Sequence, residues 1–193
     1  MHIECVDKWV QGETIDLTLT VLYEEGIQVE PITFHKTAFT SDFSSHSRRE
    51  GFAIYRDIDG TWEKVESEES CFAIFDDPPI PVQVGDAGKF DKEFVTLHPG
   101  ETWSEIFRQQ SESWSNLPSE VQAGDHFKVV IRGAILDWWD FGTKEDHRET
   151  EVELPCFIAG DIEKPKDNGG RPKIVVPASN EILFTIKNAE QVC

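Results

Sequence analysis

The sequence predicts an all-β protein, an immunoglobulin-like antiparallel β-sandwich with long inserted loops. Eight to ten short segments carry apolar or alternating apolar and polar residues, and turn-forming residues separate them. No segment shows a convincing amphipathic helical pattern, and no internal repeat is present. A lipocalin-type barrel is the alternative, but the Pro-rich breaks and long irregular connections favour the sandwich.

The first strands are expected near the N-terminus. Ile3–Val10 predicts a short strand, and Ile15–Tyr23 alternates apolar and polar residues with a period of two. That alternation is typical of an antiparallel strand with one face buried and one face in solvent. Ile27–Phe34 predicts a further extended segment, and Pro31 within it indicates an edge strand because proline donates no ladder hydrogen bond.

Two turns are predicted in the middle of the chain. Asp59-Gly60 separates Phe52–Arg56 from Thr61–Val65, and Asp-Gly between alternating runs is a strong hairpin signal because both turn positions favour positive φ. The segment His98–Glu101 contains Pro-Gly, which predicts a tight turn between the strands on either side of it.

The strongest strand pattern is Phe127–Ala134, and it continues into Ile135–Phe141, the densest aromatic patch. Glu163–Pro172 is rich in charge, Pro and Gly and is expected to be a mobile loop. We expect a single domain over residues 1–193 with an irregular insertion around 138–172. The predicted core contains Leu17, Leu19, Val21, Phe127, Val129 and Ile131.

Composition limits which partners and which cellular compartment are expected. The 193 residues include 37 acidic and 18 basic residues, a net charge of −19, which argues against nucleic acid and anionic membranes as partners. No apolar run approaches the roughly 20 residues of a membrane helix, and no secretory signal is visible. The scattered cysteines form no CxxC, so we expect reduced thiols and a cytoplasmic location. They are Cys5, Cys71, Cys156 and Cys193.

The order of segments resembles a known family. The segments concerned are Leu17–Val21, Gly51–Asp57, Phe94–Thr102 and Pro177–Phe184. They are similar to the β-sandwich propeptides of fungal deuterolysin-type metalloproteases, which share an L-x-P-G-E turn and an S-N-E-l last strand. The resemblance implies the sandwich fold. This chain has no H-E-x-x-H, so no catalytic residue of that family is transferred to it.

Familiar catalytic and cofactor motifs are absent from the sequence. It contains no G-x-S-x-G and no Gly-rich phosphate loop, so no cofactor is expected. No two of the six histidines are separated by two, three or four positions, and no metal site is expected. Asp146-His147 puts a carboxylate beside an imidazole, but neighbouring strand residues point to opposite faces.

The aromatic patch is the predicted functional site. Two adjacent tryptophans, Trp138 and Trp139, cannot both face the core of a continuing strand, so one is exposed, lines a pocket or lies under a loop. In the packing alternative, one plugs the end of the sandwich and the other lies under the insertion. In the pocket alternative, a desolvated carboxylate there acts as general acid or base. The catalytic candidates are Asp137, Asp140 and His147, and the ligand-binding candidates are Trp138, Trp139, Phe141, Trp103 and Tyr55.

Three functions remain open from the sequence. The first is a binding module that recognises an apolar small molecule or a protein through the aromatic patch. The second is a cofactor-free isomerase, cyclase or hydratase with Asp/His acid–base chemistry, and the third is a protease inhibitor. A deep apolar pocket with a desolvated carboxylate favours the enzyme, and a flat exposed aromatic patch favours the binder. The oligomeric state is left open.

Overall fold

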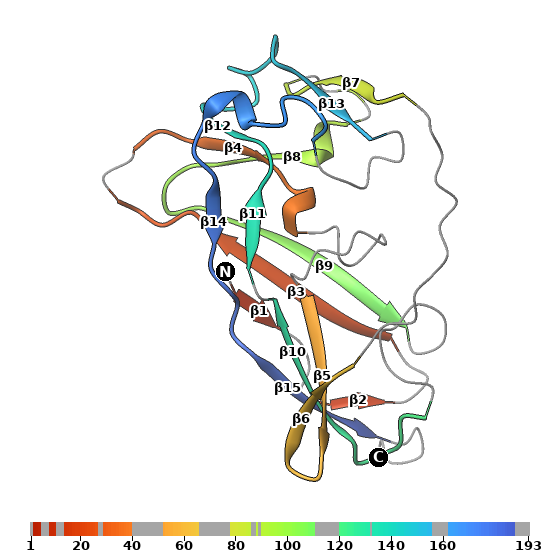
Figure 1. The fold of residues 1–193 in the computed structure, drawn as a ribbon. Coiled ribbons are helices and arrows are strands. Elements are labelled where there is room, and N and C mark those ends of the chain that lie inside the picture. The colour runs from red at the N-terminus through yellow and green to blue at the C-terminus, as the bar shows by residue number, and fades with distance from the viewer. Residues whose placement is uncertain are drawn as a thin grey trace.

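The protein is built from β-sheets with very little helix, as the sequence predicts, and its strand pairs are antiparallel apart from the parallel pair of β2 and β15 (Figure 1). The computed structural model describes residues 2–4, 8–10, 14–26, 29–39, 52–65, 78–85, 88, 90–110, 120–131, 133–155 and 162–187. The strands are β1 (His2–Glu4), β2 (Lys8–Val10), β3 (Thr14–Leu22), β4 (Ile32–His35), β5 (Phe52–Ile58), β6 (Thr61–Lys64), β7 (Ile80–Gln83), β8 (Phe94–Leu97), β9 (Thr102–Gln110), β10 (His126–Ile131), β11 (Ala134–Leu136), β12 (Trp139–Phe141), β13 (Glu151–Leu154), β14 (Ile174–Val176) and β15 (Ile182–Lys187). Two short 3₁₀ helices, η1 (Asp91–Glu93) and η2 (Asn168–Gly170), complete these elements.

Two long antiparallel ladders form the framework. In the first, β3 pairs with β9, and the same two chain segments pair again as β4 and β8. In the second, β10 pairs with β15 and then β11 with β14. The ladders meet where β12 pairs with β4, which gives the sheet order β12-β4-β8. The continuous extended pattern from Phe127 to Phe141 therefore becomes three strands that link both ladders.

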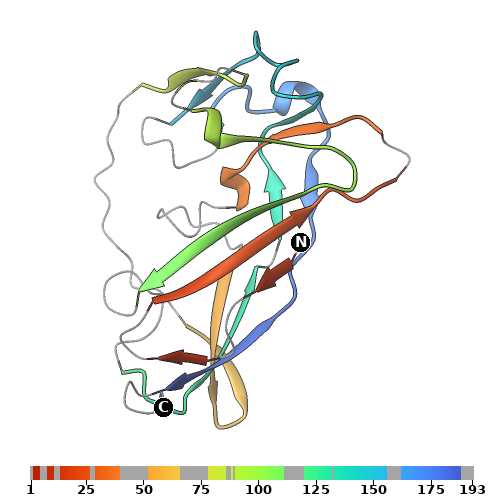
Figure 2. The ribbon, with the colours of Figure 1, turned by 180° about the vertical axis from the view of Figure 1, so that it is seen from behind.

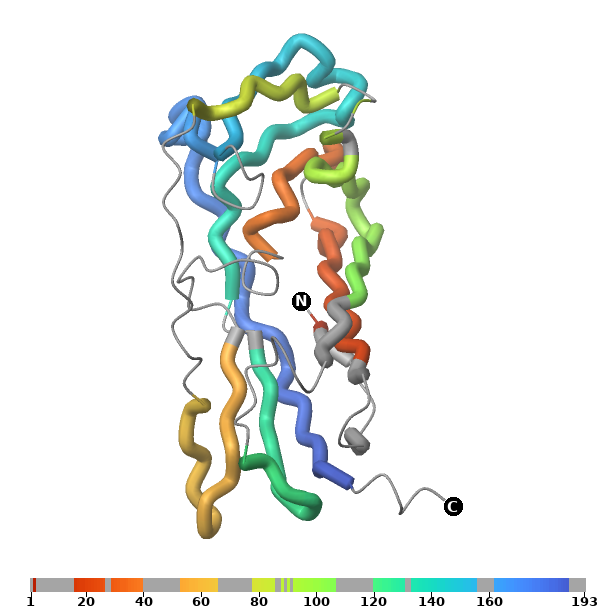
Figure 3. Tube along the Cα trace, turned by 90° about the vertical axis from the view of Figure 1, so that its right-hand side faces the viewer, coloured from red at the N-terminus to blue at the C-terminus, as the bar shows by residue number. Residues whose placement is uncertain are grey.

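The main core lies between two layers. One layer has the order β1-β3-β9 and the other the order β2-β15-β10-β5-β6. Figure 3 shows the β3–β9 pair of the first layer facing β15, β10 and β5 of the second. Figure 2 shows β3 and β9 crossing one side of the molecule. Alternate residues of β3, β10 and β15 supply the core, as period-two strands with one buried face require. The predicted core residues Leu17, Leu19, Val21, Phe127 and Val129 are all buried. The side chain of Ile131 lies outside the described part, and immunoglobulin-like connectivity stays a prediction.

A second, smaller core covers the other face of the β12-β4-β8 sheet. Its members are Val82, Val84, Phe94, Trp138, Val152, Leu154 and Ile162. The β7–β13 pair carries four of these residues on or next to its strands and lies at the top of Figure 1. The middle sheet is therefore buried on both faces, and all four residues of β4 are buried. Segment 138–172, expected as an irregular insertion, contains β12 and β13 and contributes to both cores.

The two predicted turns form, but only the first of them closes a hairpin. Asp59 and Gly60 have φ of 52° and 84°, and Ile58 pairs with Thr61, so β5 and β6 make the expected two-residue hairpin. Gly100 has a φ of 86° in the second turn. The strands beside it do not pair with each other, because β8 pairs with β4 and β9 with β3. That turn bends one side of the first ladder rather than closing a hairpin.

Three expected elements differ in the structure. Ile3–Val10 is not one strand, because β1 pairs with β3 in one layer and β2 pairs with β15 in the other. The segment with Pro31 does not form an edge strand: β4 lies in the centre of its sheet, and Pro31 precedes the strand so that no ladder donor is lost. Glu163–Pro172, expected to be mobile, is docked on β12 through the buried Asn168.

Several expectations concern residues that the structure does not describe. The four cysteines, the loop 41–49 and the apolar run 71–75 lie outside the described residues. Within the described part of the chain, no helix has the length and apolar character needed to cross a membrane.

Candidate functional site

Asp137 lies in the bend between β11 and β12, with only 11% of its side chain exposed. Its Oδ1 accepts a hydrogen bond of 2.9 Å from the backbone N–H of Trp138, and its Oδ2 accepts one of 2.7 Å from that of Ile162. His35 Nδ1 lies 3.2 Å from the same Oδ2, and His35 Nε2 lies 3.0 Å from the Thr37 hydroxyl. The carboxylate therefore joins β4 to the bend and to the segment at Ile162.

The order carboxylate, imidazole, hydroxyl is that of a catalytic triad. Because a carboxylate only accepts, His35 Nδ1 donates to Asp137, and in the neutral ring Nε2 accepts from the Thr37 hydroxyl. However, His35 is 0% exposed and Thr37 is 3% exposed. Every polar atom of the imidazole is also already paired. This geometry fits a structural connection under the second core, and a catalytic role for Asp137 stays a prediction.

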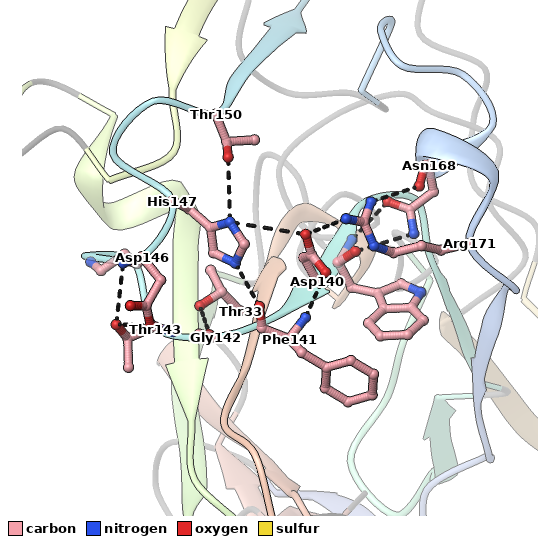
Figure 4. A network of polar contacts seen from close by, with 12 residues as sticks. Thr33, Asp140, Phe141, Gly142, Thr143, Asp146, His147, Thr150, Asn168 and Arg171 are labelled. Atoms are coloured by element: carbon pink, nitrogen blue, oxygen red, sulfur yellow. Dashed lines mark hydrogen bonds and ion pairs between the residues drawn. The ribbon is translucent and has the colours of Figure 1, made fainter.

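Asp140 lies at the centre of a second network, which Figure 4 shows. Its Oδ2 contacts the Arg171 guanidinium and lies 4.0 Å from His147 Nδ1. His147 is buried, its Nε2 donates to the Phe141 carbonyl over 3.0 Å, and its Nδ1 lies 3.3 Å from the Thr150 hydroxyl. Two of the catalytic candidates, Asp140 and His147, therefore lie close together, and a catalytic role for them stays a prediction. Their side chains also hold β12 against the turns before β13.

Asn168 completes this network from the loop before β14. Its Oδ1 accepts from the Trp139 N–H over 3.0 Å, and its Nδ2 donates to the Trp139 carbonyl over 3.2 Å. The side-chain amide thus pairs with β12 much as a neighbouring strand would. Arg171 Nη1 donates to the Asn168 carbonyl over 3.1 Å, and Trp139 Nε1 donates to the Pro172 carbonyl over 3.0 Å.

Asp146, beside His147, serves the local turn. Its Oδ2 accepts hydrogen bonds of 2.7 Å from the Thr143 backbone N–H and 2.8 Å from the Thr143 hydroxyl. These bonds, the backbone bond most of all, lower the pKa of Asp146 from its usual value. The group therefore stays ionised at neutral pH and does not have the raised pKa of a general acid.

The two tryptophans are both buried, on opposite sides of β12. Trp138 is 1% exposed and packs in the second core, where its ring meets Phe94 edge-to-face. Trp139 is 5% exposed and packs in the main core. Opposite orientation follows from the period of the strand, but burial on both sides arises because this strand lies between two cores. The rings do not face a common space, and this agrees with the packing alternative.

The other ligand-binding candidates are spread over the molecule. Trp103 on β9 packs against Phe34 and Phe39 beside the main core. Phe141 is 40% exposed at the end of β12, and its ring contacts Trp139 edge-to-face. Tyr55 lies on β5, in a different sheet from β12. The structure therefore places Phe141 beside Trp139, whereas Trp103 contacts Phe34 and Phe39, and Tyr55 lies in a different sheet.

Tyr55 instead belongs to an exposed aromatic surface on the layer of β5, β6, β10 and β15. We call it the outer sheet face and define it by Tyr55, Trp62, Lys128 and Leu183. Lys128 pairs with both Tyr55 and Leu183 across neighbouring strands, and its Nζ lies 5.1 Å from the Tyr55 ring centre and 5.2 Å from that of Trp62. Trp62 is 37% exposed and Leu183 is 60% exposed.

Sequence reasoning missed Trp62, Lys128 and Leu183 as members of one surface. The Asp59-Gly60 hairpin could have placed Trp62 near Tyr55, because a two-residue turn determines the register of both strands. Lys128 lies between the buried Phe127 and Val129, so its outward direction was also visible in the sequence pattern. The pairing of β10 with both β5 and β15 is nonlocal and had no sequence signal.

The described residues contain no group of three or more His, Cys, Asp or Glu arranged to hold a metal ion. Comparisons with protein-family models, with curated proteins and with solved structures find no match for this chain. The resemblance to deuterolysin propeptides therefore stays a prediction.

Proposed function

We propose that this protein is a binding module that recognises a protein partner through the outer sheet face. The observation that carries the proposal is the arrangement of two aromatic rings around Lys128, beside the exposed Leu183. Exposed tyrosine and tryptophan provide large contact area with few side-chain torsions to immobilise, and they are enriched at protein interfaces. An exposed sheet surface suits a protein partner better than a small molecule, which favours a concave site.

The proposed binding surface is therefore the outer sheet face and not the aromatic patch of Ile135–Phe141. Trp138 and Trp139 fill two cores and offer little surface to a ligand, whereas Tyr55 remains a candidate contact residue. The enzyme alternative is supported less well, because Asp137 uses both oxygens for hydrogen bonds within the fold. The protein partner replaces the apolar small molecule as the preferred ligand class.

Selection of displayed random peptides against the immobilised protein tests this proposal. Affinities of the recovered peptides are measured by calorimetry for the parent, for Trp62→Ala and for Leu183→Ser. We expect Trp62→Ala to weaken binding about tenfold or more, the usual effect of removing an aromatic anchor. Ile106→Ser is the matched control, since Ile106 is 62% exposed on β9 in the other layer. Recovery of no binding peptide, or equal binding by all four proteins, contradicts the proposal.

A further inference from the structure

The outer sheet face has a charge character that differs from the rest of the chain. Outward positions of its strands carry Lys64 and Lys187 in addition to Lys128, and the acidic residues beside them are Asp57 on β5 and Glu181 just before β15. The whole chain, by contrast, contains about two acidic residues for each basic one, 37 against 18. At physiological ionic strength charges are screened over about 8 Å, so a docked group is influenced mainly by the charges of this face, where three lysines stand against Asp57 and Glu181, and less by the net charge of the chain.

Lys128 is the best-placed of these lysines to bind an anion. Its side chain is only 16% exposed, because the rings of Tyr55 and Trp62 lie beside it. Glu181 reaches it from the start of β15 with a distance of 3.0 Å between Lys128 Nζ and Glu181 Oε1. The Glu181 side chain is 57% exposed, so this carboxylate lies at the surface, where another carboxylate can replace it.

We propose that the outer sheet face binds an acidic peptide segment of its partner, and that a partner carboxylate takes the place of Glu181 at Lys128. This inference rests on the proposed function and specifies its partner. The aromatic rings limit hydration around the ammonium, which strengthens its attraction for an anion relative to a fully solvated lysine. An apolar side chain next to the partner's carboxylate would pack on Leu183, which neighbours Lys128 in the ladder.

The selected peptides also provide the test. We expect them to share an aspartate or glutamate beside an apolar residue. Lys128→Met keeps most of the aliphatic stem and removes the charge, and it should weaken binding about tenfold. Glu181→Gln removes the competing carboxylate and should strengthen binding about threefold. Lys92→Met is the control, because it makes the same charge change at the exposed Lys92 of η1.

A double-mutant cycle isolates the contact between Lys128 and the carboxylate of the peptide. Changing the peptide's acidic residue to its amide should weaken binding to the parent but have little effect on binding to Lys128→Met. Glu181→Gln keeps the inference testable if Lys128→Met fails to fold. Peptides whose binding depends on Trp62 but not on Lys128 or Glu181 overturn the carboxylate inference and leave the proposed function standing. Peptides insensitive to Trp62→Ala overturn both.

Discussion

Asp137 illustrates how much of this structure depends on single polar side chains. Burying a carboxylate is unfavourable unless hydrogen bonds replace the lost water. Here both oxygens accept hydrogen bonds, from two backbone N–H groups and from His35. The same residue was a candidate general acid or base in the sequence, because a desolvated carboxylate is expected in an active site and in a buried hydrogen-bond network alike.

Asp137→Asn distinguishes these two roles. The structural role predicts a loss of about 1–3 kcal/mol in the free energy of unfolding, because the amide NH₂ would face the donor of Trp138 or Ile162. Urea unfolding of the parent and the variant measures it. Asp140→Asn should have a smaller effect, since the Asp140 side chain is more exposed, at 20%. Unchanged or raised stability of Asp137→Asn would instead support a strained, catalytic carboxylate.

Among the elements, the loop before β14 shows how an edge strand is completed without another strand. The sheet order β12-β4-β8 leaves β12 at an edge among the described strands. Asn168 pairs with the backbone of Trp139 at this edge, and Asn168 itself has a φ of 54°. Asparagine tolerates this left-handed conformation better than most residues. The charge and proline content of the loop indicated disorder, but the buried amide of Asn168, the Arg171–Asp140 ion pair and the hydrogen bond from Trp139 to the Pro172 carbonyl dock it.

Asn168→Gly and Asn168→Ala separate the contribution of the Asn168 side-chain amide from its tolerance of a positive φ. Asn168→Gly removes the amide but suits the positive φ, so it should lower the free energy of unfolding by about 1–3 kcal/mol through the unpaired Trp139 groups. Asn168→Ala should lose about 1 kcal/mol more, because its Cβ is strained at positive φ. Denaturant unfolding measures both. A glycine variant as stable as the parent would show that the amide does not dock the loop.

For the whole molecule, net charge is the dominant electrostatic feature. A charge of −19 on a chain of 193 residues produces repulsion that opposes the compact state. Described ion pairs such as Arg56–Asp125 and Lys128–Glu181 offset part of it locally. Partly exposed pairs contribute little each, so the repulsion is expected to dominate the response to salt.

Raising the salt concentration should therefore stabilise the protein. Between about 10 mM and 150 mM NaCl the Debye length falls from about 30 Å to about 8 Å, which screens the repulsion among the excess carboxylates. We expect the melting temperature in calorimetry to rise by several degrees over this range. Sodium sulfate at equal ionic strength serves as a comparison for specific anion effects. A falling melting temperature would mean that attractive ion pairs outweigh the net charge.

Local features of the fold were predictable because their causes lie within a few residues. Period-two alternation identified Leu17, Leu19 and Val21 as core, and Asp59-Gly60 identified the hairpin through its need for positive φ. The same reasoning showed that Trp138 and Trp139 point in opposite directions. These properties depend on the pleat and on backbone sterics, which the local sequence specifies.

Tertiary structure alone decided what lies on each side of those strands. Trp139 is buried in the main core, and Trp138 is buried as well because the β7–β13 pair adds a second core above β12; that pairing joins segments about 70 residues apart. Pairing of distant strands also brings Asp137 to His35, next to the β12–β4 pair, and Lys128 to Tyr55, in the β10–β5 pair. Pairing between distant strands depends on the complementarity of whole faces and on loop-closure entropy, and neither is encoded in the short windows in which periodicity and turn signals can be recognised.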